Sequence, residues 1–551
     1  MARSKCRVRD ARRTADPGEP THRLLQLALF PAFALVALFV YRGAMDGPFL
    51  SDDVPYITGN RYVQELSLEN LTVILDPVGR AIPLTANYSP VHLLLHAVEW
   101  QVFGRDVRGW HLVNVLLHAL GSALLALLLL RSGLPATAAV GGAAFFLLHP
   151  ANVEAVAWIS QLKTTSAFVL VLGALLAHPR RPLVATALFA LAILAKPLAA
   201  FALPVALLRD WAGDRPRYAW LGGWAAAFAL LTLFEVLAFR EYAVSGDPLH
   251  GDPWVWARTS FALAARYLAM AATSYGVSTF HELPLSLSWL DPWWLAGLIA
   301  SVLLAWRSIA ALRRRRGEAA WWVWAAVSFA PVAQLFPFDF GMADRYLYLI
   351  LPGLIGGVLL AVREEYGTAL AAMIQRPAIR AAALLLAAAV GVGFAAHSGR
   401  RAAIWRSAGL ILADSISHYP QGRLAQLGAA RRAVEVGDGQ ALARHLRAAI
   451  DAGSRSLPQL LNEFGGARTH PAVDAVFRDL ASTRIERLAE LEAPNQTELN
   501  VLALAYEVRG EIEPALAALE RARAMGGPDA PLFDVRIAEL RRQARSGAPG
   551  R

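Results

Sequence analysis

Two adjacent carboxylates, Asp52 and Asp53, follow the first long apolar run of the chain in the stretch "GPFLSDDVPYITGN". A carboxylate at this position can take a proton from a hydroxyl, ligate a divalent cation, or act as a polar stop after a helix. If the protein uses Mg²⁺ or Mn²⁺, Asp52 or Asp53 is the expected ligand. No other spacing of His, Asp or Glu in the chain predicts a protein metal site.

Lys196 stands between two apolar halves in "ALAILAKPLAAFALPVALL". A charged side chain at membrane depth is costly, so it is expected to face a partner or a water-filled cavity. Because Pro197 follows it, the position also suits a turn between two spans. Snorkelling of the lysine to the membrane interface is the alternative.

A second polar group lies in "HPANVEAVAWISQLKTT". Glu154 and Trp158 are four residues apart and share one face of a helix. This spacing predicts an amphipathic helix lying at the outer membrane surface, with its Trp at headgroup level. A purely interfacial anchor explains Trp158 but leaves His149 and Lys163 unexplained.

The stretch "GMADRYLYLILPG" places Asp344 and Arg345 at the outer end of an apolar run. One interpretation is a local ion pair followed by an aromatic belt of Tyr346 and Tyr348. The other is that the planar guanidinium of Arg345 binds a phosphate. Both interpretations stay open from the residues alone.

The composition indicates a polytopic membrane protein. The chain has 551 residues, of which 56% are hydrophobic and 17% charged, whereas soluble domains carry about 25% charged residues. The net charge of +10 comes from Arg and Lys at the ends of apolar runs, which is the positive-inside pattern and argues against nucleic-acid binding. The single cysteine, Cys6, excludes an internal disulfide.

Apolar runs long enough to cross a bilayer predict an all-α bundle of about eleven spans within residues 24–399. The expected spans are 24–41, 109–131, 136–150, 164–178, 182–195, 197–209, 218–239, 292–312, 320–338, 346–363 and 380–397. Residues 1–23 form a basic cytoplasmic tail, although a signal peptide is the alternative for the first run. Residues 42–108 form the first outer loop, and residues 256–276 are expected to be interfacial or re-entrant.

An odd number of spans puts the C-terminal region on the same side as the Asp pair. It also gathers candidate site residues on that outer face: Asp52, Asp53, His149, Glu154, Lys163, Lys196, His281, Glu282 and Arg345. Carboxylates and cations on one membrane face suggest a reaction on an anionic, lipid-borne substrate. A carboxylate can accept the proton of a hydroxyl, and cations can stabilise a departing phosphate.

Residues 400–551 are charged, Ala- and Leu-rich and helical in period. The segment "NQTELNVLALAYEVRGEIEPALAALERARAMGGPD" fits one tetratricopeptide repeat, and a looser copy spans residues 422–453, with Gly437 and Asp438 at its turn. Such helix pairs bury their apolar faces by stacking. We expect a short soluble array that docks a partner or an extended substrate; an undifferentiated helical tail is the alternative.

The order of "FLSDDVPYITGN", "WHLVNVLLHAL", "HPANVEAVAWISQLK", "AKPLAAFALPVALLRDW" and "MADRYLYL", with repeats at the end, resembles a known family. These are the transmembrane and tetratricopeptide-repeat O-mannosyltransferase-like proteins and their bacterial relatives, of the GT-C class of glycosyltransferases. The resemblance implies a polyprenyl-phosphate-sugar donor and an active site at the outer surface. It makes Asp52 the expected base, with Asp53 orienting or binding the acceptor or a metal.

The same resemblance places His149, Glu154, Lys163 and Arg345 near the site. The chain departs from the family in two places. It reads "LKTT" where relatives often have Arg-Lys-Asp, and "NYSP", which contains Tyr88, where they have Tyr-Arg-Pro. Arg80 is a possible substitute for that missing arginine at the donor phosphate.

The expected function is inverting transfer of a sugar, possibly mannose, to a hydroxyl of a protein or of a glycan or lipid acceptor. The expected location is a bacterial inner membrane, with the repeats in the periplasm. The rival hypothesis is a non-catalytic, membrane-anchored repeat scaffold for envelope assembly. A transporter would need inverted repeats or broken helices at the midplane, and the sequence shows no convincing halves of that kind.

Overall fold

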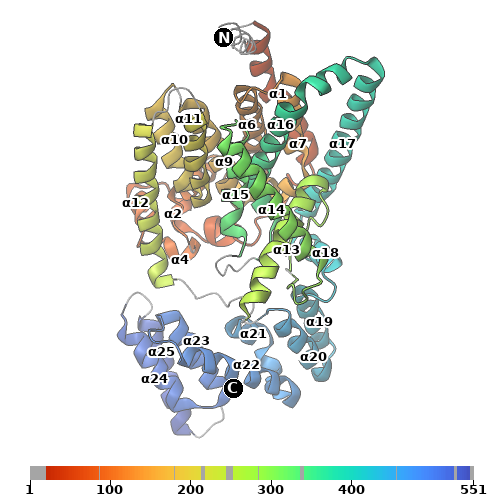
Figure 1. The fold of residues 1–551 in the computed structure, drawn as a ribbon. Coiled ribbons are helices and arrows are strands. Elements are labelled where there is room, and N and C mark those ends of the chain that lie inside the picture. Colours follow the sequence, from red (N-terminus) through yellow and green to blue (C-terminus); the bar gives the residue numbers. More distant parts are fainter. Residues whose placement is uncertain are drawn as a thin grey trace. The chain divides into compact units, whose positions relative to one another are not determined.

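The structure is a computed structural model, and it describes residues 20–85, 87–178, 180–212, 218–242, 252–282, 284–334, 341–454, 456–526 and 530–546. Over these residues every regular element is a helix and there is no strand (Figure 1). The chain divides into two compact units, one of Met1–Ala238 with Gly246–Asp414, and one of Phe239–Ser245 with Ser415–Arg551. The predicted boundary at residue 399 lies within the last long apolar helix, which runs on to Ile404. The first unit extends to Asp414, which pairs with Arg401 and accepts a hydrogen bond from the Thr279 amide.

The first unit, called the membrane unit below, holds both long apolar helices and short connecting ones. Its longer helices are α1 (Pro20–Tyr41), α5 (Pro90–Phe103), α6 (Val107–Arg131), α7 (Ala136–Leu148), α9 (Leu162–Ala177), α10 (Pro182–Ala195), α11 (Ala202–Ala212), α12 (Tyr218–Tyr242), α13 (Pro253–Thr273), α14 (Pro292–Arg313), α15 (Ala319–Phe329), α16 (Asp344–Ile374) and α17 (Pro377–Ile404). The short ones are η2 (Val54–Thr58), α2 (Arg61–Gln64), α3 (Leu68–Leu75), α4 (Ile82–Thr85), η3 (Pro150–Asn152), α8 (Val153–Ala157), η4 (Ile159–Gln161), η5 (Pro197–Phe201) and η6 (Ala330–Val332). Helix α18 (Ala408–His418) carries the chain out of this unit.

Among the described residues, six helices are long and apolar enough to cross a membrane, or seven if the bent pair Ala136–Leu148 and Pro150–Ala157 is one span. Three shorter apolar helices, Ala28–Tyr41, Pro182–Ala195 and Ala319–Val332, also coincide with predicted spans. The chain is therefore an integral membrane protein, and the predicted all-α bundle is confirmed. The predicted span 197–209 has no counterpart in this set, because η5 and α11 divide it. Helix α13, expected to be interfacial or re-entrant, is also outside the set.

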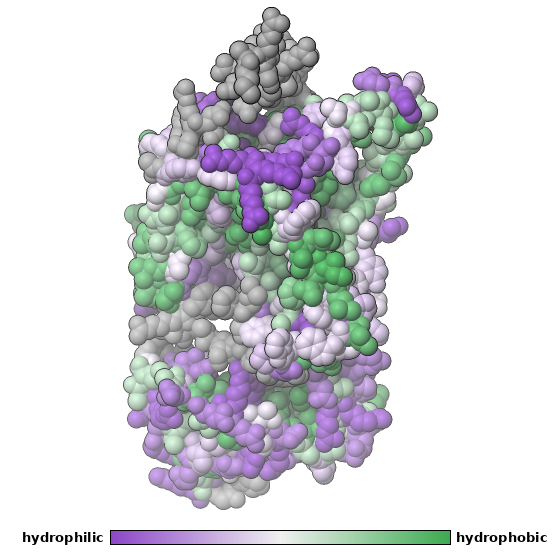
Figure 2. Space-filling model, in the orientation of Figure 1, coloured by the Kyte–Doolittle hydropathy of each residue, from purple (hydrophilic) through white to green (hydrophobic). Residues whose placement is uncertain are grey.

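The hydropathy of the surface agrees with this assignment. Figure 2 shows apolar side chains gathered over the flanks of the long helices, and polar side chains gathered at the end where α14 and α15 are joined. Exposed leucines such as Leu303 on α14 and Leu385 on α17 belong to the apolar surface. An apolar surface of this extent is unfavourable in water and is favourable in contact with lipid chains.

The long helices alternate in direction, which gives the bundle two distinct ends. Helices α1, α7, α10 and α17 finish at the end of the bundle where α6, α9 and α16 begin. Two contacts show this for α7, α16 and α17. Ser398, near the end of α17, donates a hydrogen bond to the carbonyl of Leu148, the last residue of α7, and Arg345, in the first turn of α16, contacts Glu154, shortly after α7. The basic residues Arg131, Arg181 and Arg376 lie at the opposite helix ends. The structure thus separates the helix ends that carry these basic residues from the end that carries Glu154 and Arg345.

The second unit consists of paired helices: α19 (Arg423–Glu435), α20 (Gly439–Asp451), α21 (Leu457–Phe464), η7 (Gly465–Thr469), α22 (Pro471–Ala489), α23 (Gln496–Arg509), α24 (Ile512–Ala524) and α25 (Ala530–Ser546). Both predicted helix pairs form at the expected positions. Leu502 and Leu519 share one buried core, and the turns use Gly437 and Gly510, whose φ angles of +72° and +82° suit glycine.

Candidate functional site

The two adjacent aspartates have different environments. Asp53 is 1% exposed; its Oδ2 accepts a hydrogen bond of 2.8 Å from the Leu50 amide, and its Oδ1 accepts one of 2.7 Å from the Ser160 amide and another from the Ser160 hydroxyl. Asp52 is half-buried, and its nearest hydrogen-bond donor is the Ser51 hydroxyl at 3.5 Å. Asp53 therefore joins two distant loops, whereas Asp52 is the less buried of the two carboxylates.

The backbone around this pair is unusual. Ser51 has a φ of +50°, in the left-handed region that a residue with a side chain rarely adopts. One π-helical turn, η2, follows Asp53 and contains Pro55. Strained residues and π-turns occur most often at functional sites. The chain thus holds Asp52 at a bend, while the bonds of Asp53 keep that bend in place.

Burial sets the ionisation of Asp53. It raises the pKa of this carboxyl to about 6, although the hydrogen bonds from Leu50 and Ser160 act in the opposite direction. Near neutral pH the carboxylate form therefore predominates, with both oxygens occupied.

Two lysines face the same region. Lys163, at the start of α9, is half-buried; its Nζ lies 3.5 Å from the Tyr56 hydroxyl and 4.9 Å from the centre of that ring. The Nζ of Lys196 donates a 2.7 Å hydrogen bond to the Thr164 hydroxyl, one helical step from Lys163. In the part of the chain that the structure describes, neither ammonium forms an ion pair with a carboxylate. The predicted turn at Lys196 is present, between α10 and η5.

The third cation is Arg345, in the first turn of α16. Glu154 binds it twice, through a 2.7 Å hydrogen bond from the Arg345 amide and an ion pair with the guanidinium. The carboxylate thus lies at the N-terminus of α16, where the helix dipole favours negative charge. The guanidinium also lies 5.4 Å from the Trp158 ring and 5.0 Å from the Tyr346 ring. These contacts fix its position, and the charge of Asp52 acts on both Arg345 and Lys163.

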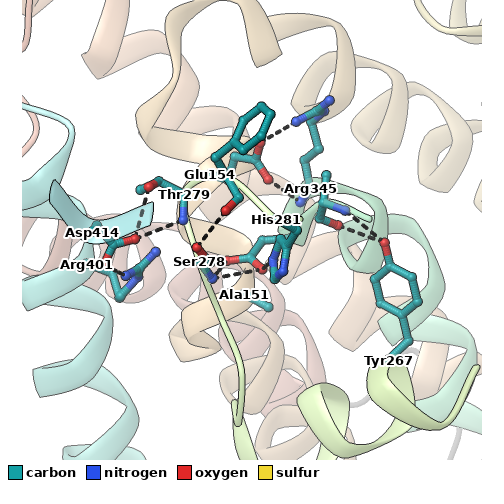
Figure 3. A network of polar contacts seen from close by, with 12 residues as sticks. Ala151, Glu154, Tyr267, Ser278, Thr279, His281, Arg345, Arg401 and Asp414 are labelled. Carbon is teal, nitrogen blue, oxygen red and sulfur yellow. Dashed lines mark hydrogen bonds and ion pairs between the residues drawn. The ribbon is translucent and has the colours of Figure 1, made fainter. Parts of the chain in front are cut away.

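A network of polar contacts supports the start of α16 (Figure 3). Asp344 accepts hydrogen bonds from the Ser278 amide, at 3.1 and 3.3 Å, and its Oδ1 lies 2.6 Å from His281 Nε2. The next amide, that of Thr279, donates a 3.0 Å bond to Asp414. The loop that contains His281 is therefore tied to the residue next to Arg345. His281 thus contacts Asp344, and the half-buried Glu282 follows it in the chain.

Two interpretations of the sequence are wrong. Residues 149–162 are all buried, and α8 has only five residues, so this segment is no amphipathic helix at the membrane surface; Trp158 instead stacks on Trp405 at 5.7 Å. Tyr346 and Tyr348 are also buried and form no aromatic belt, since the Tyr348 hydroxyl lies 3.0 Å from His118 Nδ1. Arg345 pairs with Glu154 rather than locally with Asp344.

The remaining candidates from the sequence lie around the site rather than in its centre. His149 is buried, with Nδ1 accepting from the Ala151 amide and Nε2 lying 3.2 Å from the Ala271 carbonyl, so both ring nitrogens are engaged. Tyr88 is buried and donates a 2.8 Å bond to the Leu75 carbonyl. Arg80 is exposed, between α3 and α4. The structure thus brings together Asp52, Lys163, Lys196, Glu154 and Arg345.

The residues do not suit a protein-held divalent cation. Both oxygens of Asp53 accept hydrogen bonds from protein donors, and the charge of Asp52 acts on the cations Lys163 and Arg345. Among the described residues, no group of three or more His, Cys, Asp or Glu could hold a metal ion.

No protein-family model matches the chain, and no curated protein matches it. Among solved structures, the chain is similar to the crystal structure of ArnT from Cupriavidus metallidurans bound to undecaprenyl phosphate. The sequences are 17% identical and the TM-score is 0.35, over 74% of this chain and 80% of that one. A likeness this distant does not identify the chemistry of this chain.

Sequence reasoning missed one set of residues next to the site. His92, His96 and Glu99 are buried on one face of α5, and Tyr56 packs against His92. The signal was present, because spacings of four and three residues repeat one helical face. It was overlooked because α5 lies within the expected outer loop and outside the predicted spans.

Proposed function

We propose that the protein transfers a sugar from a polyprenyl-phosphate donor to a hydroxyl, with inversion, at the outer end of the membrane unit. The observation that carries this proposal is one accessible carboxylate, Asp52, whose charge acts on Lys163 and Arg345. Lys196 lies close to this group, because it donates a hydrogen bond to Thr164, the residue after Lys163. Two of these cations lack a carboxylate partner among the described residues. Buried charges without partners are unfavourable in a folded protein and mark ligand sites.

The charge of the site suits a phosphate leaving group. With both lysines protonated, the three cations and Glu154 leave two positive charges, without counting Asp52. A phosphodiester donor carries one negative charge, and a phosphate monoester carries about 1.5 to 2 near neutral pH. The cations therefore bind the leaving group more strongly as the bond to the sugar breaks, which is the condition for lowering the barrier.

In this mechanism Asp52 accepts the proton of the acceptor hydroxyl. The acceptor oxygen attacks the anomeric carbon from the side opposite the phosphate, and the phosphate oxygen leaves with the electron pair of the broken bond. Lys163, Lys196 and Arg345 stabilise that oxygen. Asp53 holds the Asp52 loop against Ser160, so it positions the base and does not react.

An apolar cavity supports a lipid-linked donor. It has a volume of about 490 Å³ and lies among α7, α13, α14, α15 and α16, with Phe145, Leu304 and Leu351 in its wall. Leu351 is six residues along α16 from Arg345, which corresponds to about 9 Å along the helix axis. A phosphate at Arg345 would therefore place the first isoprene units of its lipid near this cavity.

The finer identity of the substrates rests on the family resemblance of the sequence. It supports mannose as the sugar, and a protein or a glycan or lipid hydroxyl, presented by the C-terminal repeats, as the acceptor. It also supports a bacterial inner membrane with the repeats outside the cytoplasm.

The test uses the full chain in proteoliposomes with polyprenyl-phosphate mannose and a panel of hydroxyl-bearing peptides and glycolipids. The wild type should release polyprenyl phosphate and form a glycosylated product. D52N should lower turnover by about 10²- to 10⁴-fold, the range for loss of a general base, without loss of insertion. The matched control is D46N, since Asp46 is an exposed residue of the same loop paired with Arg108. Equal turnover by wild type and D52N would exclude Asp52 as the base.

The second unit, with its own buried cores, favours a scaffold as the second candidate. In that case the full chain would capture an envelope protein through the repeats, and D52N would bind it as well as the wild type does. No turnover of any polyprenyl-phosphate sugar would accompany binding.

A further inference from the structure

The segment that leads out of the membrane unit lies against the proposed site. It runs from Arg401, in the last turn of α17, to Asp414 in α18, and is called the connector below. An ion pair between these two residues closes it into a loop. Asp414 is the last residue of the membrane unit, and the next residue of α18, Ser415, begins the second unit. The transfer mechanism gives this segment no role.

An aromatic stack connects this segment to both parts of the site. The Trp405 ring stacks on the Trp158 ring, with the ring centres 5.7 Å apart and the planes at 24°. Trp158 Nε1 donates a 3.3 Å hydrogen bond to the carbonyl of Leu50, two residues before Asp52. The guanidinium of Arg345 lies 5.4 Å from the centre of the Trp158 ring. One indole thus contacts both the loop of the proposed base and the cation proposed for the phosphate.

The backbone of the connector also touches the loop of the base directly. A Cβ atom added at Gly47 would lie 2.6 Å from the Trp405 carbonyl oxygen. That distance is too short for a side chain, so the close approach of the two backbones requires glycine. Because Gly47 begins the stretch that leads to Asp52, Trp405 lies against this loop through its backbone as well as through the stack.

A polar route leads from the other end of the connector to Arg345 (Figure 3). Asp414 accepts hydrogen bonds from the Thr279 amide, at 3.0 Å, and from the Thr279 hydroxyl, at 2.9 Å. The preceding amide, that of Ser278, donates to Asp344 at 3.1 and 3.3 Å, and Asp344 directly precedes Arg345 in the first turn of α16. Each step of this route is a hydrogen bond or a peptide bond, so the route is continuous.

The two routes matter because transfer depends on the separation of two groups. In the proposed mechanism the acceptor hydroxyl at Asp52 and the phosphate at Arg345 lie on opposite sides of the anomeric carbon, so both must be held in place. Trp158 and Trp405 are 7% and 6% exposed. Side chains that are fixed by packing and hydrogen bonds in this way are the ones that hold reacting groups in position.

Building on the proposed function, we infer that the connector holds Asp52 and Arg345 at the separation that transfer requires. Trp405 and Asp414 act through their neighbours in the stack and in the polar route, so they are positioning residues. Because α18 continues from Asp414 into the second unit, the segment that fixes the site also carries the repeats.

The experiment measures turnover per folded molecule of the full chain in proteoliposomes, with polyprenyl-phosphate mannose and a hydroxyl-bearing peptide. W405L and D414N should each lower kcat by about 10- to 10²-fold, since a displacement of about 1 Å in a site can cost 10²-fold. T279V is the second variant for the polar route, in case D414N does not fold. It removes the hydroxyl bond to Asp414 and keeps the amide bond, so it should lower kcat by less than D414N does.

Matched controls lie at the other end of α9, which begins next to Lys163. There Trp224 stacks on Phe189, with the ring centres 4.3 Å apart, and Asp210 lies 2.9 Å from His178 Nε2. W224L and D210N therefore remove a similar stack and a similar carboxylate contact away from the site. Both should lower the melting temperature and keep the wild-type turnover per folded molecule.

A double variant separates positioning from a general loss of stability. R345K keeps the charge at this position and removes the planar guanidinium, and D414N/R345K should be no slower than R345K alone, because residues that act as a unit are not additive. A structural role would make the two effects additive, or would leave D414N and W405L at the turnover of D210N and W224L. Either result with an active wild type would overturn the positioning role alone. Absence of turnover in the wild type would overturn the proposed function and the positioning role together.

Discussion

The two ends of the membrane unit differ in whether their buried charged side chains have oppositely charged partners. At the end with the basic loops, Glu318 is 0% exposed and is fully matched. It accepts hydrogen bonds from Arg307 Nε at 3.0 Å, from Arg307 Nη2 at 2.6 Å and from Trp322 Nε1 at 3.0 Å. Arg316 adds ion pairs with Glu364, at 3.3 Å, and with Glu365. This network joins α14, α15 and α16, and the protein alone supplies its partners.

At the other end, the hydrogen bonds that Lys163 and Lys196 form with described residues go to hydroxyl groups and not to carboxylates. Asp52 is accessible, and Glu154 is committed to Arg345. The comparison separates two uses of charge in one bundle. Charges that satisfy one another hold helices together, whereas charges that the protein leaves unmatched are available to a ligand.

Among the variants that test this comparison, the largest loss of turnover is expected from removing an unmatched cation. K196M keeps the length of the side chain and removes its charge, and we expect kcat to fall by about 10²- to 10³-fold, as when one stabilising donor of a transition state is lost. Stability should stay equal or increase, because an ammonium with little solvation is replaced by an apolar group. Turnover and melting temperature, measured on one preparation, check both parts. Loss of stability with unchanged turnover would show instead that Lys196 stabilises the fold and does not take part in transfer.

The opposite result is expected for the matched network. E318A leaves Arg307 without its main partner, and removing one member of a buried ion pair costs about 3–5 kcal/mol. Denaturant titration in detergent should show this loss, while turnover per folded molecule stays near the wild-type value. E365A is the milder control, since Glu365 is exposed and its partners Arg307 and Arg316 keep Glu318. A large fall in kcat for folded E318A would remove the distinction between the two ends.

The sequence predicted the helices better than the site, and the reason is physical. Apolar runs and helical periods are local signals, so most spans and both helix pairs appear where they were expected. The division of labour between Asp52 and Asp53 depends on Ser160, which is 107 residues away along the chain. The pairing of Glu154 with Arg345 spans 191 residues. No spacing rule reaches across such separations.

The segment around Glu154 and Trp158 also shows why local patterns did not predict the site. Glu154 and Trp158 fit an amphipathic period, but the helix ends after Ala157 and the surrounding bundle buries every residue. Periodicity shows which residues share a face and not what covers that face. His92, His96 and Glu99 carried a helical spacing of the same kind, and only the fold shows that their common face is buried.

Asp53 offers an intermediate case, since it has hydrogen-bond donors but no ion-pair partner among the described residues. Its pKa is raised from 3.8 to about 6 by burial, so the folded state holds a proton that the unfolded state releases between these values. Its contribution to stability is therefore present below about pH 4 and is lost as pH rises through 6, by at most about 3 kcal/mol. D53N cannot titrate, so the stability of the wild type relative to D53N should be greater at pH 4 than at pH 7. D46N is the control, and a difference that is constant with pH would contradict the assignment.

The smallest effect is expected where charges and caps are satisfied within one helical turn, as in the second unit. Asn495 and Glu498 form a reciprocal cap at the start of α23, with bonds of 2.9 Å from the Glu498 amide and 2.8 Å from the Asn495 amide. N495A should cost about 1 kcal/mol, seen as roughly five-fold faster hydrogen exchange in the first turn of α23. Ser456 caps α21 without a side-chain hydrogen bond, so S456A should leave exchange there unchanged. Equal changes in hydrogen exchange for the two variants would show that the side-chain cap of α23 contributes nothing to stability. The expected difference would show that the lost stability comes from a bond within one helical turn, whereas the ion pairs of the membrane unit join residues far apart in the chain.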